Sequence, residues 1–304
     1  MRACSRGLLA LLLGSVGLLA AACSGTVAHD DLKNAGSVIP GLTVSGDVGV
    51  DPVVRMRTPL AVDETTPVTT VTGTGAPILV DQLFVLELTL YDARTGKLAL
   101  STYRTGTAVA AKTTSDTLFP ALSDALVGVK QGSRLVLAAT AEDAYGSGGV
   151  PPKGVSRNDP VVVIADVVAV PPQQVLPSAQ GTPVPHVPRS PDLVSSSGVP
   201  NRIDFSTVEA PSKDRAYLQV LGTGPVVKAH DLVTVNYIAQ RSTEQFPFQN
   251  TFLKDPEQVA LGTGTAPAVF DRFLVGLHRG SRLLIYGPSK NGMIAWVVDV
   301  LGVS

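Results

Sequence analysis

The sequence is poor in the residues that most often carry catalysis or cross-links. Two of its 304 residues are cysteines, Cys4 and Cys23, and only four are histidines, which lie far apart. No H-x-x-x-H or C-x-x-C spacing occurs, so we expect no metal and no other cofactor. The Gly-rich phrase at 145–149 lacks the G-x-S-x-G order of a nucleophile elbow. With no disulfide available, stability must come from burial of a core, which domains above ~100 residues can achieve.

Charge is also sparse, and it is balanced. Charged residues make up 16% of the chain, and the formal net charge is −1 with acids and bases interspersed. A nucleic-acid-binding face needs clustered basic residues, so we expect no nucleic-acid partner. Glycine and proline are abundant instead, with 29 and 23 residues, beside many valines, threonines and leucines. This composition favours strands and turns over long helices.

The N-terminus has the pattern of a signal sequence. Arg2 and Arg6 precede the apolar run 7–22, which is short for a bilayer span and typical of a signal peptide. The run ends in LAAAC, which resembles a bacterial lipobox and implies cleavage before Cys23 and a lipid on its thiol. An ordinary secretory signal cleaved near Ala22 is the alternative. We predict a signal peptide at 1–22, a tether at 23–42 and a lipid-anchored protein on the extracytoplasmic face of the cell membrane.

A phrase that occurs twice indicates a duplicated unit. VGVKQGSRLVL occupies 127–137 and VGLHRGSRLLI occupies 275–285, while TGTG at 72–75 recurs as LGTG at 221–224. We align Asp81, at the start of DQLFVLEL, with Asp231, at the start of DLVTVNYI. The near-constant spacing predicts two copies of one domain, at 43–170 and 201–304. The Pro-rich residues 171–200 predict an extended, semi-rigid linker.

Both copies have the same predicted order of elements. An alternating strand comes first, and it places Leu83, Val85 and Glu87 on one face in the first copy. In the second copy Val233 and Tyr237 share the corresponding face. A helical stripe of apolar residues, the GSRL strand and a Val-rich last strand follow. Between these last two strands, the first copy contains a segment with the phrase DAYG that the second copy lacks.

This ordered set of motifs resembles the FKBP-type peptidyl-prolyl cis-trans isomerases. The set runs G-x-G, D-x-V-x-V-x-Y, helix, G-x-R-x-L-x-I, A-Y-G and P-P, and it covers 54–170 and 203–303. The resemblance implies an α+β fold of two tandem FKBP-like domains, each a twisted antiparallel sheet wrapped around one short helix. It also implies rotation of X-Pro amides in an apolar pocket. The partners would be X-Pro-containing polypeptides, such as unfolded or secreted proteins.

In the first copy, the resemblance places the pocket at the start of the helix and in the A-Y-G loop. The residues at the family's catalytic positions are Leu118, Phe119, Leu122 and Tyr145. Those at its substrate-binding positions are Leu100, Ser101 and Val163. Phe119 falls where the family donates a backbone N–H to a substrate carbonyl. Glu87 falls where the family has the tyrosine of its first strand.

In the second copy, the same comparison gives a less complete pocket. The residues at substrate-binding positions are Tyr237, Phe248, Phe270 and Trp296. Pro267 falls on the position of the N–H donor, and proline has no N–H. Because the A-Y-G segment is also missing, we expect this copy to be degenerate and the first copy to be the more active one.

Two functions stay open from the sequence. One is a prolyl isomerase that assists secreted proteins at the cell envelope. The other is a catalytically decayed binding or chaperone lipoprotein, because several pocket positions depart from the family's pattern. Plain core packing is the favoured interpretation of Leu118, Leu122 and Val163, since apolar residues at these spacings usually just pack. Ig-like repeats are disfavoured by the helical stripe in each copy.

Metabolic labelling tests the predicted anchor. Cells that express the full chain and take up radioactive palmitate should yield a labelled protein, because the lipobox resemblance places the lipid on Cys23. Cys23→Ala should abolish the label. Cys4→Ala changes only the segment predicted to be removed, so it should keep the label. A Cys23→Ala protein that is still labelled would contradict the anchor.

Overall fold

We describe a computed structural model of the chain, for residues 37–146 and 148–304. The predicted signal peptide, Cys23 and residues 23–36 of the predicted tether lie outside the described residues. The described residues belong to one compact unit. In the described ranges, no helix has both the length and the hydropathy that crossing a membrane requires.

The elements are mostly short strands. One sheet contains β4 (Thr66–Val71), β5 (Leu83–Asp92), β6 (Leu98–Ser101), β7 (Val109–Lys112), β8 (Arg134–Ala139) and β9 (Val161–Ala169). Another contains β10 (Thr182–Pro183), β13 (Arg215–Leu221), β14 (Leu232–Arg241), β15 (Gln249–Asn250), β16 (Glu257–Ala260), β17 (Arg282–Ser289) and β18 (Gly292–Val303). Two smaller sheets are formed by β1 (Ser37–Ile39), β2 (Leu42–Ser45) and β3 (Val53–Met56), and by β11 (Asp192–Ser196) and β12 (Val199–Asp204). The helices are α1 (Thr102–Thr105), α2 (Pro120–Leu126), α3 (Ala141–Tyr145) and α4 (Ala268–Phe273).

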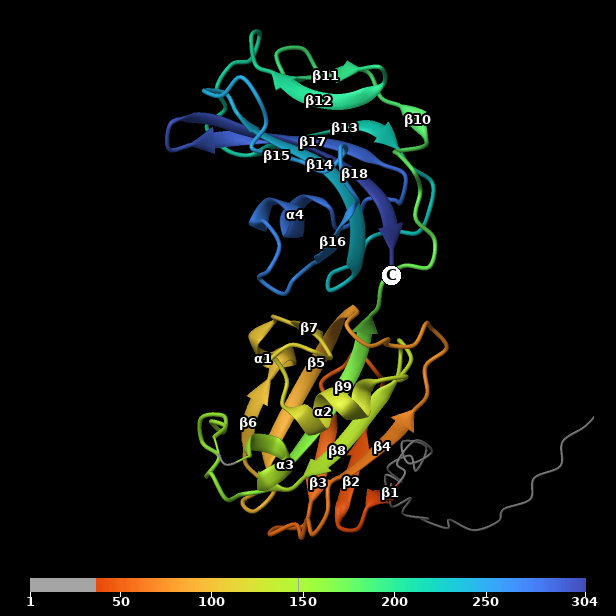
Figure 1. Cartoon of the computed structure of the whole chain (residues 1–304), viewed down its shortest axis with the longest axis vertical. Coiled ribbons are helices and arrows are strands. Elements are labelled where there is room, and N and C mark those ends of the chain that lie inside the picture. The colour runs from red at the N-terminus through yellow and green to blue at the C-terminus, as the bar shows by residue number, and fades with distance from the viewer. Residues whose placement is uncertain (1–36, 147) are drawn as a thin grey trace, which may run out of the picture. The chain divides into compact units, whose positions relative to one another are not determined.

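The two large sheets have the same antiparallel topology (Figure 1). The first has the order β4-β8-β9-β5-β6, with β7 also paired to β5. The second has the order β10-β13-β17-β18-β14-β15, with β16 also paired to β14. Apart from β10, each strand of the second sheet corresponds to one strand of the first. The fold therefore repeats as the sequence does, and we call the two copies the first and the second repeat.

A short helix packs on one face of each large sheet. In the first repeat, Leu122 and Leu126 of α2 are buried in a cluster that includes Phe84 and Leu137 of the strands. α2 begins at Pro120, whose fixed φ suits the first helical position and whose missing N–H costs no helical bond there. In the second repeat, Phe270 of α4 lies in the corresponding cluster. This arrangement of a helix on an antiparallel sheet agrees with the α+β fold predicted from the sequence.

The opposite face of each sheet is covered as well. Leu42 and Val44 of the small sheet β1-β2-β3 pack in a cluster with Val136 and Ile164 of β8 and β9. In the second repeat, Ile203 of β12 lies in a cluster with residues of β14, β17 and β18. The central strands therefore bury both faces, which explains why they are apolar almost throughout instead of alternating.

The repeated GSRL phrase forms a buried ion pair in the first repeat. Arg134 of β8 contacts Asp166 of β9 through two bonds of 2.7 Å, and both side chains are almost fully buried. The Arg134 guanidinium also donates to the carbonyls of Gly46 and Asp47, at 2.8 Å each. The N–H of Gly49 donates to Asp166 Oδ2 at 2.8 Å. The pair thus fixes the loop between β2 and β3 against the sheet.

The second repeat has the same ion pair. Arg282 Nε and Nη2 of β17 lie 2.5 and 2.8 Å from the two carboxylate oxygens of Asp299 on β18. The N–H of Ala179, from the segment before this repeat, donates to Asp299 Oδ2 at 3.1 Å. In both repeats, therefore, the ion pair holds a segment that precedes the large sheet in the sequence.

The serine of the GSRL phrase explains why the TGTG and LGTG phrases also recur. Ser133 Oγ accepts a hydrogen bond from the N–H of Gly73 at 2.9 Å, and Ser281 Oγ accepts one from Gly222 at 3.0 Å. A Cβ added at Gly73 would lie 2.1 Å from the carbonyl oxygen of Gln131. Only glycine allows this close approach of two backbones.

Two predicted segments differ from the structure. Residues 37–42, which we predicted as part of the tether, contain β1 and the start of β2, and Leu42 is buried. The predicted linker, 171–200, contains β10 and β11, which pair with β13 and β12. The N–H of Gln180 also donates to the carbonyl of Gly280 at 2.8 Å. Proline did not prevent this pairing, because β10 lies at a sheet edge, where one side of the strand needs no partner.

The predicted alignment of the first strands is wrong by one residue. Asp81 corresponds to His230 and not to Asp231, since Asp81 and His230 both have positive φ, 60° and 67°, at the turns before β5 and β14. The two acidic residues misled the alignment, whereas the chain geometry follows the turn.

As a result, Leu88 and not Glu87 corresponds to Tyr237. The N–H of Leu88 donates to Thr102 Oγ1 at 2.8 Å, and the N–H of Tyr237 donates to Thr251 Oγ1 at 2.7 Å. Leu88 lies in the core cluster beside α2, while Glu87 is buried away from that cluster and accepts a hydrogen bond from the Thr102 hydroxyl. Successive strand side chains alternate between faces, so a slip of one residue reverses the assignment.

Removing the charge of Asp166 should destabilise the first repeat strongly. Asp166→Asn leaves Arg134 buried without its counter-charge, so we expect the free energy of unfolding to fall by about 3–5 kcal/mol. Urea denaturation measures this change. Glu244→Gln is the matched control, because its pair with Arg241 is exposed and should contribute less than ~1 kcal/mol. Equal losses in the two variants would contradict the importance of the buried pair.

Candidate functional site

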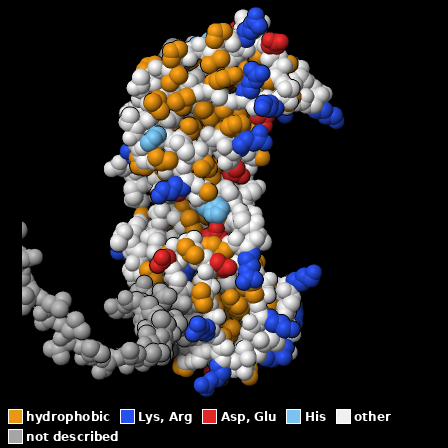
Figure 2. Space-filling view, turned by 180° about the vertical axis from the view of Figure 1, so that it is seen from behind, with side chains coloured by type: hydrophobic (Ala, Val, Ile, Leu, Met, Phe, Trp, Pro, Cys, Tyr) orange, Lys and Arg blue, Asp and Glu red, His pale blue; other side chains and the backbone are white. Residues whose placement is uncertain are grey.

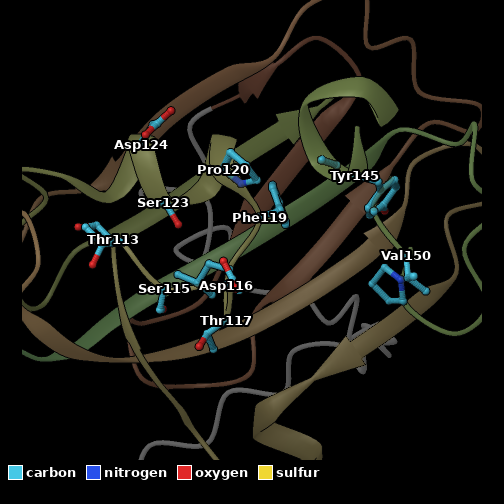
Figure 3. A pocket seen from close by; sticks show the side chains of 15 residues that line it. Thr113, Ser115, Asp116, Thr117, Phe119, Pro120, Ser123, Asp124, Tyr145 and Val150 are labelled. Carbon is cyan, nitrogen blue, oxygen red and sulfur yellow. The ribbon is translucent and has the colours of Figure 1, made fainter. Parts of the chain in front are cut away.

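A pocket of about 540 Å³ opens in the first repeat beside the start of α2 (Figure 3). Its walls come from the segment that leads into α2, from α2 itself, from α3 and from the loop after α3. The lining residues are Thr113, Thr114, Ser115, Asp116, Thr117, Leu118, Phe119, Pro120, Ser123, Asp124, Ala144, Tyr145, Gly149, Val150 and Pro152. Tyr145 and Val150 lie at one end, Asp124 and Thr113 lie at the other, and Phe119 lies between them.

Three of the predicted catalytic residues meet in this pocket. Leu118, Phe119 and Tyr145 all line it. Leu122, the fourth, is buried in the core beneath α2 and does not line the pocket. Its helix turns the Leu122 side chain toward the sheet, so core packing describes its position better than a pocket wall does.

The predicted substrate-binding residues of the first repeat lie elsewhere. Val163 of β9 is fully buried in the core cluster. Leu100 at the end of β6 is 39% exposed, and neighbouring Ser101 is buried with its hydroxyl unpartnered in the described structure. None of the three lines the pocket. Their contribution to binding stays a prediction.

Polar groups in the pocket wall have no partner within the described part of the chain. The Tyr145 hydroxyl and the Ser123 hydroxyl are both buried and make no hydrogen bond. The backbone N–H of Phe119, which comes directly before Pro120, also has no acceptor among the described residues. Buried polar groups are almost always paired in folded proteins, so unpaired donors at a cavity are available to a ligand.

The loop that carries Tyr145 is fixed at both ends. Residues 140–160 connect β8 to β9, and α3 begins after Thr140, whose hydroxyl accepts the N–H of Asp143. At the far end, Arg94 Nε and Nη2 bind the two carboxylate oxygens of Asp159 at 2.6 and 2.8 Å. This bidentate contact holds the pKa of Asp159 below its usual range. The described ends of the loop are therefore held in place beside the pocket.

The second repeat has no comparable wall. β17 and β18 pair up to Ser289 and Gly292, so the six residues 288–293, with Lys290 and Asn291 as the turn, stand where the first repeat has residues 140–160. The strands of this repeat are thus joined by a tight turn, in keeping with the shorter sequence. Pro267 precedes α4 and offers no N–H, which leaves this repeat without the donor that Phe119 supplies in the first.

The aromatic residues of the second repeat are arranged differently from the first. Tyr237 meets Phe270 edge to face, with ring centroids 5.4 Å apart, and its hydroxyl donates to Glu257 at 3.0 Å. Both rings line a hollow with Ala266 and Pro267. The two other predicted residues do not line it. Phe248 is half exposed beneath the guanidinium of Arg241, and Trp296 on β18 packs against the core cluster.

Sequence reasoning missed the polar side of the first pocket. The hydroxyl-rich run Thr113–Thr117 and the residues Ser123 and Asp124 line the pocket without belonging to any motif. Ser123 and Asp124 were visible as the polar positions of the α2 stripe, but periodicity does not tell a solvent face from a pocket wall. Among the described residues, no group of three or more His, Cys, Asp or Glu side chains could hold a metal ion.

Tyr145 should make the stability of the protein depend on alkaline pH. Burial, with smaller contributions from the charges of Asp92 and Asp159, raises the pKa of Tyr145 from 10.0 to about 12. The neutral phenol therefore stabilises the fold fully below pH 10, and this contribution is lost as the pH rises through about 12. Tyr145→Phe should reduce the loss of stability over that range, as measured by urea denaturation at several pH values. The same pH dependence in both proteins would contradict the raised pKa.

Comparisons with known proteins give only distant similarities. No protein-family model matches the chain, and a search of curated proteins found no match. Among solved structures, it is similar to FkpA from Escherichia coli, with 20% identity, a TM-score of 0.29 and 34% of this chain covered. This match spans 46% of the FkpA chain, less than half its length.

Two other solved structures have similar scores. The three FKBP domains of wheat FKBP73 align over 79% of this chain and 94% of that chain, with 14% identity and a TM-score of 0.30. A peptidyl-prolyl cis-trans isomerase from Pseudomonas syringae aligns over 43% of this chain and 81% of that chain, with 15% identity and a TM-score of 0.31. These neighbours are FKBP-type isomerases, but identities and scores this low assign no activity. The resemblance to that family rests on the chain's own ordered motifs.

Proposed function

We propose that the protein is an FKBP-type peptidyl-prolyl cis-trans isomerase that acts through the pocket of the first repeat. The observation that carries the proposal is the grouping of Phe119 and Tyr145 in one cavity, with an unpartnered N–H and an unpartnered hydroxyl beside apolar side chains. Both residues stand at positions where the family resemblance places catalytic groups.

The reaction needs no nucleophile. An X-Pro amide rotates over a barrier of roughly 18–20 kcal/mol because resonance makes the C–N bond partly double. An apolar surface such as that of Phe119, Val150 and Pro152 favours the twisted, less dipolar amide over the planar one. Donors such as the Phe119 N–H and the Tyr145 hydroxyl could hold the carbonyls of the twisted form, which lowers the barrier only if they bind that form better.

We propose that the second repeat is not catalytic. Its pocket lacks the loop wall, Pro267 replaces the N–H donor, and the Tyr237 hydroxyl is already bound to Glu257. The lipobox resemblance supports a further proposal, that the protein is anchored by lipid at the extracytoplasmic face of the membrane. There it would act on X-Pro bonds of secreted polypeptides.

A binding module without catalysis is the second candidate function. The observation in its favour is the rim of the first pocket, where Thr113, Thr114, Ser115 and Thr117 present hydroxyls. Such a rim hydrogen-bonds an extended chain readily, yet it also admits water, which weakens discrimination between planar and twisted amides.

Measured cis/trans exchange on short X-Pro peptides separates the two candidates. The full chain should accelerate exchange, and Tyr145→Phe should slow it about tenfold, because one donor to the twisted amide is lost. Tyr237→Phe in the second repeat is the matched control and should leave the rate unchanged. Peptide binding without any acceleration would contradict the enzyme and favour the binding module.

A further inference from the structure

We infer that the pocket of the first repeat selects proline-containing segments that carry lysine or arginine next to the proline. This inference rests on the proposed function, since it assigns a substrate class to the same pocket. It starts from the division of the cavity into two ends (Figure 3). Tyr145 and Val150 form an apolar end, whereas Asp116 and Asp124 lie away from it beside threonine and serine hydroxyls.

The carboxylates of the pocket are not neutralised by the protein. Within the described structure, neither Asp116 nor Asp124 makes an ion pair or a side-chain hydrogen bond, and no lysine, arginine or histidine lines the pocket. The basic residues closest in sequence to the pocket segments bind other groups or do not line the pocket. Lys112 Nζ lies 3.5 Å from Asp81, and Arg157 donates to the carbonyl of Gly149 at 2.7 Å.

The negative rim continues past Tyr145. A second hollow of about 430 Å³ shares Pro120, Asp124 and Tyr145 with the pocket and adds Glu142 from α3. Glu142 likewise makes no ion pair or side-chain hydrogen bond within the described structure. On the face seen in Figure 2, by contrast, lysine and arginine side chains stand among hydrophobic and acidic ones. The joined hollows thus combine three uncompensated carboxylates with a cavity.

Carboxylates alone would mark only a solvated surface, but this cavity has buried polar groups as well. Ser123 is 5% exposed and Tyr145 is 9% exposed. Neither hydroxyl has a hydrogen-bond partner in the described structure. Both residues line the pocket. A peptide that supplied carbonyl oxygens to these hydroxyls would satisfy them, and its orientation would then be fixed relative to the acidic end.

The pocket, of about 540 Å³, has room for a proline ring and a neighbouring side chain. A proline ring placed against Phe119 and Tyr145 leaves the next residue of an extended chain ~3.3 Å further on. The long side chain of lysine or arginine reaches several ångströms beyond its backbone, with its charge at the tip. Because Asp116 and Asp124 line the same pocket as the apolar end, we expect such a side chain to meet one of them while the proline stays at that end.

Two sets of peptides test the preference. In the first, of the form Ala-Xaa-Pro-Phe, Xaa is Lys, Gln or Glu. In the second, the same three residues are placed directly after the proline. Binding to the full chain is measured by fluorescence anisotropy, and isomerisation by cis/trans exchange. In at least one set, the Lys peptide should bind about five- to tenfold more tightly than the Gln peptide, and the Glu peptide should bind more weakly. Raising the salt concentration should reduce these ratios.

Charge-removing variants connect the preference to the named residues. Asp116→Asn and Asp124→Asn should each lower the Lys-to-Gln affinity ratio, and the double variant should bring it close to one. Asp255→Asn, which removes an exposed carboxylate outside this pocket, is the matched control and should leave the ratio unchanged. Circular dichroism confirms that each variant is folded.

The outcomes separate the inference from the proposed function. Equal affinity for the Lys, Gln and Glu peptides, with isomerisation present, would overturn the inference and leave the function intact. A Lys preference without acceleration of any peptide would overturn the enzymatic function and support the inference. A Lys preference that survives in the double variant would overturn the assignment to Asp116 and Asp124.

Discussion

The arginine–aspartate pair between neighbouring strands, fully buried in the first repeat and partly buried in the second, is the contact on which the rest of each repeat depends. Two desolvated charges are tolerated only when their geometry is good and their remaining donors and acceptors are bonded. Asp166 meets this demand with the N–H of Gly49, and Arg134 meets it with loop carbonyls. A preceding segment is thereby recruited into the fold. The same requirement explains why the GSRL phrase changed so little between the copies.

This constraint fixes the frame but leaves the ends of the strands free to diverge. β8 and β9 are locked together at Arg134 and Asp166, at one end of their pairing. At the other end, Ala139 and Val161 can be joined by a long loop or, as in the second repeat, by a tight turn. The pocket belongs to this variable end. Fold and site are therefore separable here, as is common where function is built on loops of a rigid scaffold.

The sequence predicted the features that depend on local pattern and missed those that depend on geometry. The duplication, the helix on the sheet and the missing loop follow from phrases that recur or are absent. The alignment of Glu87 with Tyr237 failed because a positive φ at His230, and not the next acidic residue, marks the turn. The hydroxyls of Thr113–Thr117 were unpredictable, because no periodicity connects that run to Tyr145, which reaches it only through the folded loop.

The proline-rich segment between the repeats has a consequence for self-association. Thr182 and Pro183 pair with β13, which would otherwise be the outermost strand of the second sheet. An unpaired outer strand can template the addition of strands from other molecules, which is a common route to aggregation. Pro183 cannot donate a hydrogen bond to a newcomer. The segment thus terminates the sheet and opposes polymerisation of the protein through this edge.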